Sequence, residues 1–171
     1  MRIIGVVGTK NTGKTILVTK IVEELVKRGF DVGTVKHTTE SFDIAGRDTW
    51  KHKESGAKLV VGAGDETFLN INESMDLENI LNLIKYTKKL DFIVIEGFKP
   101  SKYAKISTSD YKDDFTIKNV DVRKLESEDI ESLVDMIEDR SFGIYQGLDC
   151  KKCGFETCKA LQTAKITGKA A

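Results

Sequence analysis

The sequence predicts a three-layer α/β/α fold, with a mostly parallel sheet between helices. Two short and continuously apolar segments, IIGVVG at residues 3–8 and DFIVIEG at residues 91–97, are typical of strands buried on both faces. Segments of helical period alternate with such strands along the chain. The loop GTKNTGKT at residues 8–15 leads from the first strand straight into the first helix. Together these observations favour a domain built from strand–helix–strand units.

The first such unit covers residues 3–38. After the first strand, apolar residues recur at helical spacing until Gly29 supplies a C-terminal stop. The residues with this spacing are Leu17, Val18, Ile21, Val22, Leu25 and Val26. DVGTVKHT at residues 31–38 predicts a second strand, joined to the first by a right-handed crossover. Residues 41–56 are polar and predict a loop that runs into a short helix at about residues 48–54.

The same alternation continues to Arg140. AKLVVGAG and ETFLNI, at residues 57–64 and 66–71, predict two short strands. Asp76 is placed to cap a helix through Leu77, Ile80, Leu81 and Ile84, and residues 91–97 form the next buried strand. The remaining elements are weaker strands at residues 104–109 and 115–122 and a helix from Ser127 through Ile130, Leu133, Val134 and Ile137.

Composition limits the classes of function. Lys plus Arg and Asp plus Glu number 27 each in the 171 residues, so no global field favours nucleic acid or an anionic membrane. No apolar stretch approaches the ~20 residues that cross a bilayer, and the N-terminus reads as a strand rather than a signal peptide. We therefore expect a cytoplasmic protein. Beyond Arg140 the sequence is rich in Gly, Lys and Cys, which predicts a domain at residues 1–140 and a tail at residues 141–171.

The segment from Gly8 to Thr15 fits the P-loop pattern G-x-x-x-x-G-K-S/T, between a strand and a helix as this motif requires. Its glycines permit a backbone that aims several N–H groups at an anion beside a helix N-terminus. We expect Lys14 to reach the β- and γ-phosphates of a nucleotide, and the Thr15 hydroxyl to ligate Mg²⁺. The predicted nucleotide-binding residues are Gly8, Thr9, Lys10, Asn11, Thr12, Gly13, Lys14 and Thr15.

A P-loop needs an acidic partner at the end of a neighbouring strand, where it holds Mg²⁺ or its water. FIVIEG supplies Glu96 at that point, and Gly97 lets the backbone pass close to phosphate. Lys14 and Glu96 are therefore the candidate catalytic residues. Asp91 opens the same strand at its other end, and we expect it to cap the strand entry.

Two further candidate residues lie at the end of the second strand and beyond it. Asp48 and His37 lie where a P-loop protein often has a segment that senses the γ-phosphate. Asp48 is either a second acid near Mg²⁺ or a cap of the helix at residues 49–54. We expect His52 to be a solvated helix residue. The chain contains no guanine-reading N-K-x-D pattern, so its sequence by itself does not choose GTP over ATP.

Three segments together resemble the molybdopterin-guanine dinucleotide biosynthesis protein B (MobB) family in order and spacing. They are GVVGTKNTGKTILVTKIVEEL, VGTVKHTTESFDIAGRDTWKHKESGA and DFIVIEGFK. The likeness covers roughly residues 1–140. It implies a SIMIBI-type P-loop fold, a homodimer, and Mg²⁺-dependent GTP binding with weak hydrolysis. It also implies a partner, the molybdopterin guanylyltransferase that attaches GMP to molybdopterin.

The resemblance assigns roles, position by position, to three sets of residues. The phosphate loop consists of Gly8, Gly13, Lys14 and Thr15. The second motif consists of Glu96 and Gly97, and the middle motif consists of Lys36, His37 and Asp48. Many relatives have a histidine-rich run after Lys-His, where this chain has Thr38, Thr39 and Glu40. Two other functions stay open at this point. One is an adaptor that presents bound nucleotide without hydrolysis, and the other is a metal-insertion GTPase that delivers metal through the cysteines.

The three cysteines all lie in the tail, at Cys150, Cys153 and Cys158. This odd, clustered set indicates metal or redox chemistry rather than disulfides. DCKKCGFETCKALQTAKITGKA resembles the C-x₂-C-G-x₃-C iron–sulfur segment of archaeal and anaerobic redox proteins, which implies a four-iron four-sulfur cluster. Such clusters usually have four cysteine ligands, and in the resembled pattern the fourth lies about 16 residues further on. Zinc and a metal-free tail remain the alternatives.

Overall fold

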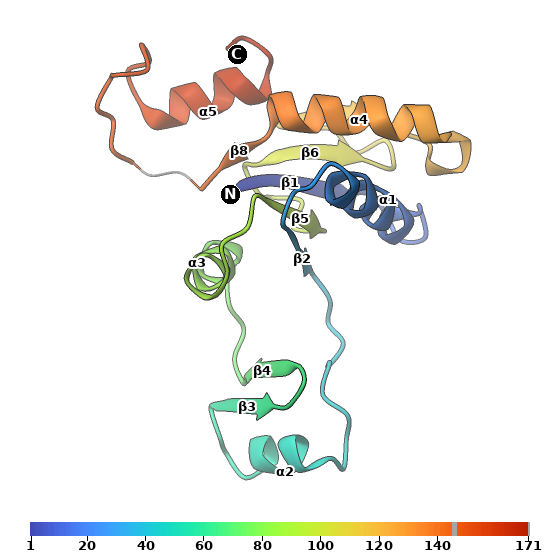
Figure 1. Cartoon of the computed structure of the whole chain (residues 1–171), viewed down its shortest axis with the longest axis vertical. Coiled ribbons are helices and arrows are strands. Elements are labelled where there is room, and N and C mark those ends of the chain that lie inside the picture. Colours follow the sequence, from blue (N-terminus) through green and yellow to red (C-terminus); the bar gives the residue numbers. More distant parts are fainter. Residues whose placement is uncertain (145–146, 171) are drawn as a thin grey trace. The chain divides into compact units, whose positions relative to one another are not determined.

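Strands and helices alternate along the chain as the sequence pattern predicts (Figure 1). The structure is a computed structural model that describes residues 1–144 and 147–170. The strands are β1 (Arg2–Val7), β2 (Val32–Lys36), β3 (Leu59–Ala63), β4 (Thr67–Ile71), β5 (Phe92–Glu96), β6 (Ala104–Ser107), β7 (Thr116–Asn119) and β8 (Phe142–Gly143). The helices are α1 (Lys14–Lys27), α2 (Asp48–Glu54), α3 (Leu77–Thr87), the 3₁₀ turn η1 (Val122–Lys124), α4 (Ser127–Arg140) and α5 (Cys158–Ile166).

The main sheet is mostly parallel, as expected. Within the described residues its order is β2–β5–β1–β6–β7, and all of these neighbours run parallel. The short β8 pairs antiparallel with Arg2 and Ile3, along the part of β1 that precedes its pairing with β6. Since β5 lies between β1 and β2, the two strands joined by α1 are not neighbours.

Side chains of the central strands alternate between two buried faces. Ile4 and Val6 of β1 pack in a core cluster with residues of α1 and α4. Ile3 and Val7 are equally buried and point to the opposite face, because successive side chains of a strand alternate. Figure 1 shows α1 and α4 on one side of the sheet and α3 on the other, and Leu81 of α3 is fully buried. The expected three-layer arrangement is confirmed.

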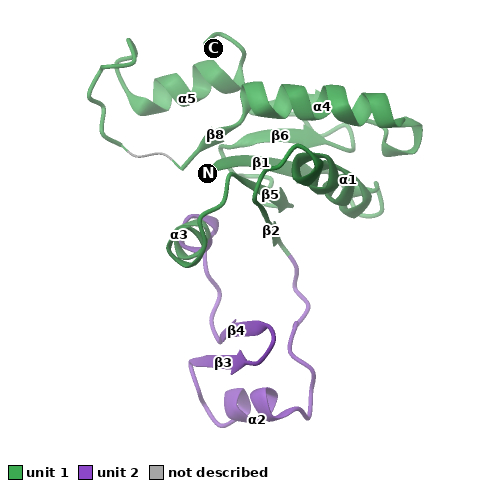
Figure 2. Ribbon diagram, viewed as in Figure 1, with its two compact units in different colours: residues 1–37, 81–171 green, residues 38–80 purple. Residues whose placement is uncertain are grey.

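The chain divides into two compact units (Figure 2). Unit 1 consists of Met1–His37 and Leu81–Ala171 and holds the main sheet. Unit 2, Thr38–Ile80, holds α2 and the antiparallel hairpin of β3 and β4. The tail segment is thus grouped with the main sheet, where the Arg140 side chain donates to the backbone carbonyl of Ile166.

The ends of several elements follow from local hydrogen bonds. Asp76 caps α3 as predicted, because its Oδ1 accepts the backbone N–H of Asn79 at 2.8 Å. The Asp91 carboxylate accepts the backbone N–H of Asp31 at 2.9 Å, which secures the entry to β5 and β2. Thr157 caps α5 by accepting the N–H of Ala160 at 3.0 Å. The sequence did not predict α5 or β8.

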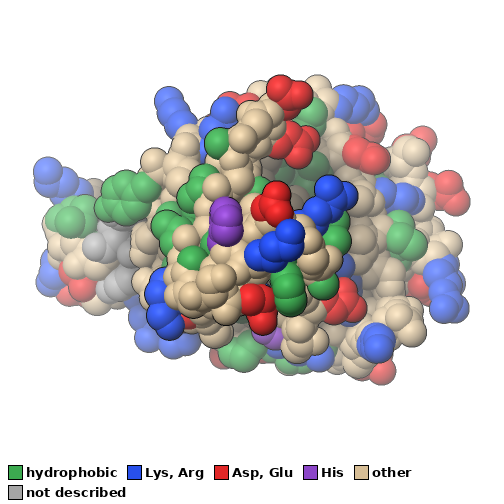
Figure 3. All heavy atoms as spheres, turned by 90° about the horizontal axis from the view of Figure 1, so that it is seen from below, with side chains coloured by type: hydrophobic (Ala, Val, Ile, Leu, Met, Phe, Trp, Pro, Cys, Tyr) green, Lys and Arg blue, Asp and Glu red, His purple; other side chains and the backbone are tan. Residues whose placement is uncertain are grey.

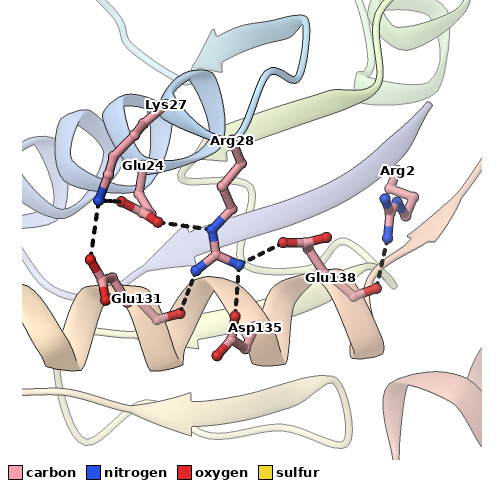
Figure 4. Close-up of polar contacts among 7 residues, drawn as sticks. All are labelled: Arg2, Glu24, Lys27, Arg28, Glu131, Asp135 and Glu138. Carbon is pink, nitrogen blue, oxygen red and sulfur yellow. Dashed lines mark hydrogen bonds and ion pairs between the residues drawn. The ribbon is translucent and has the colours of Figure 1, made fainter.

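An ion-pair network joins α1 to α4 (Figure 4). Arg28, which follows α1, donates to the carboxylates of Glu24, Asp135 and Glu138 at 2.7–2.8 Å. Its remaining nitrogen donates to the backbone carbonyl of Glu131 at 3.0 Å. These bonds fix the two helices side by side on one face of the sheet.

The surface carries both signs of charge. On the face drawn in Figure 3, basic and acidic side chains are interspersed. Among residues 1–144 and 147–170, no helix has the length and apolar content needed for a membrane span.

Candidate functional site

The loop Gly8–Thr15 lies between the carboxyl end of β1 and the first turn of α1. Gly13 has φ 82°, a left-handed conformation that L side chains rarely adopt, and it directly precedes the helix. The Gly13 carbonyl accepts the N–H of Leu17 at 3.0 Å, which starts the helical ladder. The first N–H groups of α1 therefore face the loop, and this arrangement favours an anionic ligand.

Both glycines of the loop are needed for close packing. A Cβ on Gly8 would collide with the hydroxyl groups of Thr108 and Thr12. A Cβ on Gly13 would lie 3.1 Å from the side chain of Val122 in η1. The sheet edge thus holds the loop tightly, and larger residues at either position would displace it.

Thr108 is a contact that sequence reasoning missed. It follows β6, and its N–H donates to the carbonyl of Val7 at 2.8 Å, while its hydroxyl lies 3.2 Å from the same oxygen. Its hydroxyl also meets the hydroxyl of Thr12 at 2.6 Å. Thr12 in turn donates to the carbonyl of Thr9 at 2.9 Å. The only signal in the sequence is a hydroxyl residue directly after a strand, which is too common to single out.

The structure brings Thr15 and Glu96 together. The Thr15 hydroxyl lies 3.1 and 3.0 Å from the two carboxylate oxygens of Glu96. β5 pairs with β1 in parallel, so the end of β5 lies beside the loop that follows β1. The Glu96 side chain is only 13% exposed, and its nearest cation is Lys36, whose Nζ is 4.0 Å away. A hydroxyl and a carboxylate at this distance are the oxygen ligands that Mg²⁺ prefers.

The loop carries two lysines, the exposed Lys10 and the partly buried Lys14. Lys14 is the one that a P-loop uses to bind phosphate. Its Nζ donates to the carbonyl of Thr9, so the side chain folds back along the loop instead of extending into solvent. An ammonium group beside the first N–H groups of α1 adds positive charge where an anion would bind. The arrangement as a whole can hold a polyanion together with one hard cation.

Gly97 and His37 meet at the end of β5. Gly97 has φ 96°, and a Cβ at this position would lie 2.9 Å from the Cβ of His37. The His37 backbone N–H donates to the carbonyl of Glu96 at 2.9 Å. The imidazole packs against the ring of Phe98, with centroids 4.8 Å apart and the ring planes tilted by 57°. In this structure His37 is thus held by packing next to Glu96.

Asp48 lies in unit 2. It is the first residue of α2, with Arg47 at the N-cap position, and its carboxylate pairs with Lys51 at 3.0 Å. The Asp48 side chain is 88% exposed. It therefore begins the helix rather than capping it, and its role as a second acid stays a prediction. His52 is exposed on the same helix, as expected.

The three cysteines lie at and before the N-terminus of α5. Cys150 and Cys153 are exposed, and Cys158 is partly buried. The backbone N–H of Asp149 donates to the Cys158 sulfur at 3.3 Å, and the Cys158 N–H donates to the Asp149 carboxylate at 2.7 Å. The thiols fit an iron–sulfur cluster by ligand type. In the part of the chain that the structure describes, however, no three His, Cys, Asp or Glu side chains converge on one metal position.

Comparison with known families matches two parts of the chain. The model of the MobB family, described as molybdopterin guanine dinucleotide synthesis protein B, matches residues 3–126. A second model, described as "Putative Fe-S cluster", matches residues 146–171. The first match contains the Gly8–Thr15 loop and Glu96, and the second contains all three cysteines.

Known proteins show the same likeness. A Methanocaldococcus jannaschii protein named "Putative molybdopterin-guanine dinucleotide biosynthesis adapter protein" is 31% identical over 182 residues, which covers 99% of this chain and 74% of the relative. The molybdopterin-guanine dinucleotide biosynthesis adapter protein of Escherichia coli is 35% identical over 101 residues, 56% of this chain and 58% of the relative. The crystal structure of Bacillus subtilis MobB superposes with a TM-score of 0.61 at 23% identity, covering 84% of this chain and 99% of that one. Because the family model spans well over half of the sequence, the chain belongs to the MobB family.

Proposed function

We propose that this protein is a GTP-binding adapter in the biosynthesis of molybdopterin guanine dinucleotide, with weak Mg²⁺-dependent GTPase activity. It assists the molybdopterin guanylyltransferase that attaches GMP, and it works in the cytoplasm. Two relatives carry the name of adapter protein in this biosynthesis, which supports the pathway. The nucleotide and the partner enzyme rest on the resemblance and on the geometry of the site.

The observation that carries the proposal is the contact between Thr15 and Glu96. The hydroxyl of the loop reaches both oxygens of the carboxylate, at 3.1 and 3.0 Å, directly beside the N-terminus of α1. If Mg²⁺ binds there, the Thr15 hydroxyl and the Glu96 carboxylate would hold it, and the ion would offset negative charge on the phosphates of a nucleotide. Lys14 would release the Thr9 carbonyl and turn to the β- and γ-phosphates.

Calorimetry with GTP, ATP and Mg²⁺ tests nucleotide binding. We expect Lys14→Ala to abolish triphosphate binding while leaving the fold intact, because Lys14 offsets charge on two phosphates and adds little to the core. Lys89→Ala, which removes an exposed lysine after α3, is the control for lost charge. Near-wild-type GTP affinity in Lys14→Ala would contradict the proposed phosphate loop, and tighter binding of ATP than of GTP would contradict the choice of nucleotide.

The role of hydrolysis is tested with the partner enzyme. If the protein acts as a GTPase, phosphate release should rise when molybdopterin guanylyltransferase is added. If guanylyl transfer is equally efficient with a non-hydrolysable GTP analogue, the protein presents nucleotide without turnover, and the GTPase part of the proposal fails.

We propose further that two copies associate through the hairpin of unit 2. Leu59 and Val61 are 54% and 53% exposed and alternate with Val60, which is 5% exposed. The hairpin therefore presents an apolar strip on one face, while its other face is covered. A two-stranded sheet is only marginally stable alone, so the same apolar face of a second copy is a suitable cover.

For the tail, we propose that Cys150, Cys153 and Cys158 ligate an iron–sulfur cluster. All three thiols lie within nine residues, and Gly154 adopts φ 82° between them with no atom within 4 Å of an added Cβ, so the loop can turn. Anaerobic purification followed by iron and sulfide analysis tests the assignment, with Cys153→Ser as the variant that should lose iron. Stoichiometric zinc, or no metal after anaerobic reconstitution, would contradict it.

A further inference from the structure

Unit 1 contains a cavity of about 720 Å³ at the amino end of β1. Its walls come from the start of β1, from β8, from α3 and α5, and from the cysteine segment. The Gly8–Thr15 loop follows the other end of the same strand, roughly 16 Å away along β1. The volume is in the range of small-molecule sites. The cavity is thus separate from the proposed nucleotide site.

The lining is largely apolar. Phe142 and Ile144 contribute from β8 and the residue after it, and Phe155 and Leu161 contribute from the cysteine segment and α5. Aromatic and aliphatic lining of this kind accommodates a flat apolar ring.

Three basic side chains accompany these apolar walls. Arg2, Lys85 and Lys165 line the cavity, and no Asp or Glu is among its described lining residues. Arg2 uses one nitrogen to bond the Glu138 carbonyl at 2.8 Å. No hydrogen bond or ion pair of either lysine ammonium group is found within residues 1–144 and 147–170. The lining therefore attracts an anion.

We propose that this cavity binds a small organic anion that joins a flat apolar ring to one phosphate, sulfonate or carboxylate group. The ring lies between Phe142, Phe155 and Leu161, and the anionic group meets the Lys85 and Lys165 ammonium groups beside the guanidinium of Arg2. The site is independent of the proposed nucleotide function, since it shares no residue with the Gly8–Thr15 loop.

The test uses 8-anilinonaphthalene-1-sulfonate as a ring-bearing anion and N-phenyl-1-naphthylamine as its neutral counterpart. Both are titrated into the full chain and followed by fluorescence and by NMR of the methyl groups. We expect the double variant Lys85→Met/Lys165→Met to weaken sulfonate binding at least tenfold and leave the neutral probe unchanged. The control double variant Lys88→Met/Lys159→Met removes a lysine directly after α3 and a lysine in α5, both outside the cavity. It should leave the binding of both probes unchanged. Equal losses in the two double variants, or no loss in the first, would overturn the proposal.

Competition then identifies the anionic group. Displacement of the probe by phenyl phosphate or by benzoate supports the proposal and identifies the preferred anion, while displacement by neither overturns it.

The titration is repeated at saturating Mg²⁺ and GTP. Unchanged probe affinity there confirms a separate site, and competitive loss by GTP would overturn it. Failure of GTP to bind at all would contradict only the proposed nucleotide function.

Discussion

At the scale of single residues, Glu96 is the carboxylate on which the proposed Mg²⁺ chemistry depends. We expect Glu96→Gln to bind nucleotide but to lose roughly 10–100-fold in Mg²⁺ affinity and in turnover. The amide still accepts a hydrogen bond from metal-bound water, but it lacks the charge that holds a hard cation. Calorimetric Mg²⁺ titration and phosphate-release assays measure the two effects.

Glu23→Gln, which neutralises an acid on the same side of α1, is the matched control for Glu96→Gln and should change neither quantity. If Mg²⁺ affinity and hydrolysis were the same in Glu96→Gln and wild type, Asp48 would become the better candidate for the acidic partner.

Lys105 is fully buried in β6 and pairs with Asp113. Asp113→Ala should lower the free energy of unfolding by about 3–5 kcal/mol, because it leaves an unpaired charge in the core. Lys105→Met should cost much less, since Asp113 is 28% exposed and keeps hydrogen bonds from Tyr111 and Thr116. Urea unfolding of the two variants measures the difference, and equal losses would show that the pair contributes only packing.

The same pair gives the stability a pH dependence. Burial alone would raise the pKa of Asp113, but hydrogen bonds from Lys105, Thr116 and Tyr111 outweigh it, so the pKa lies below its ordinary value of 3.8. Its stabilisation is therefore complete above pH 3.8 and is lost as the pH falls through the lower folded pKa. The stability gap between wild type and Asp113→Ala should close in that range. A gap that stayed constant down to pH 2 would contradict this.

At the scale of elements, the contact between α1 and α4 depends on Arg28 (Figure 4). Its pKa is raised, chiefly by the hydrogen bond to Glu24, and the pKa of Glu24 is lowered by the same bond. Arg28→Lys should lower the free energy of unfolding by about 1–2 kcal/mol, because an ammonium group cannot reproduce the planar set of donors. Chemical unfolding at low and high salt measures the loss. Lys27→Met, at an exposed ion pair, is the control and should leave stability nearly unchanged.

Elements with a strong local period could be predicted from the sequence, and elements defined by distant contacts could not. α1 and β5 follow from spacing and continuous apolarity alone. β8 has two residues and exists only because it pairs with Arg2 and Ile3. α5 lies in a Lys- and Thr-rich stretch whose composition resembles a tail, although Thr157 supplies a cap.

The candidate site likewise has a part that the sequence predicts and a part that depends on contacts between distant segments. The Gly8–Thr15 loop is a local motif, and the sequence placed Glu96 because carboxyl ends of parallel strands share one edge of a sheet. The contact of Thr108 with Thr12 depends on β6 being next to β1, and strand order is a property of the folded sheet that the sequence does not display.

At the scale of the whole molecule, the proposed association of two copies is open to test by light scattering after size-exclusion chromatography. Leu59→Lys/Val61→Lys should shift a dimer to a monomer, because the charges would be buried without partners at the interface. Tyr86→Lys, at an 88% exposed ring outside the hairpin, should remain dimeric. A dimer that persists in the hairpin variant would place the interface elsewhere.

The position of β5 between β1 and β2 has a consequence for synthesis on the ribosome. The chain makes β1, α1 and β2 first, yet the strand that joins them is completed only at Glu96. At cellular rates, the segment from Lys36 to Glu96 takes roughly 3–12 s to translate. Throughout that interval, the edges of β1 and β2 that later pair with β5 have no partner strand. Escape from aggregation during translation therefore depends on how well α1 shields those edges until β5 is made.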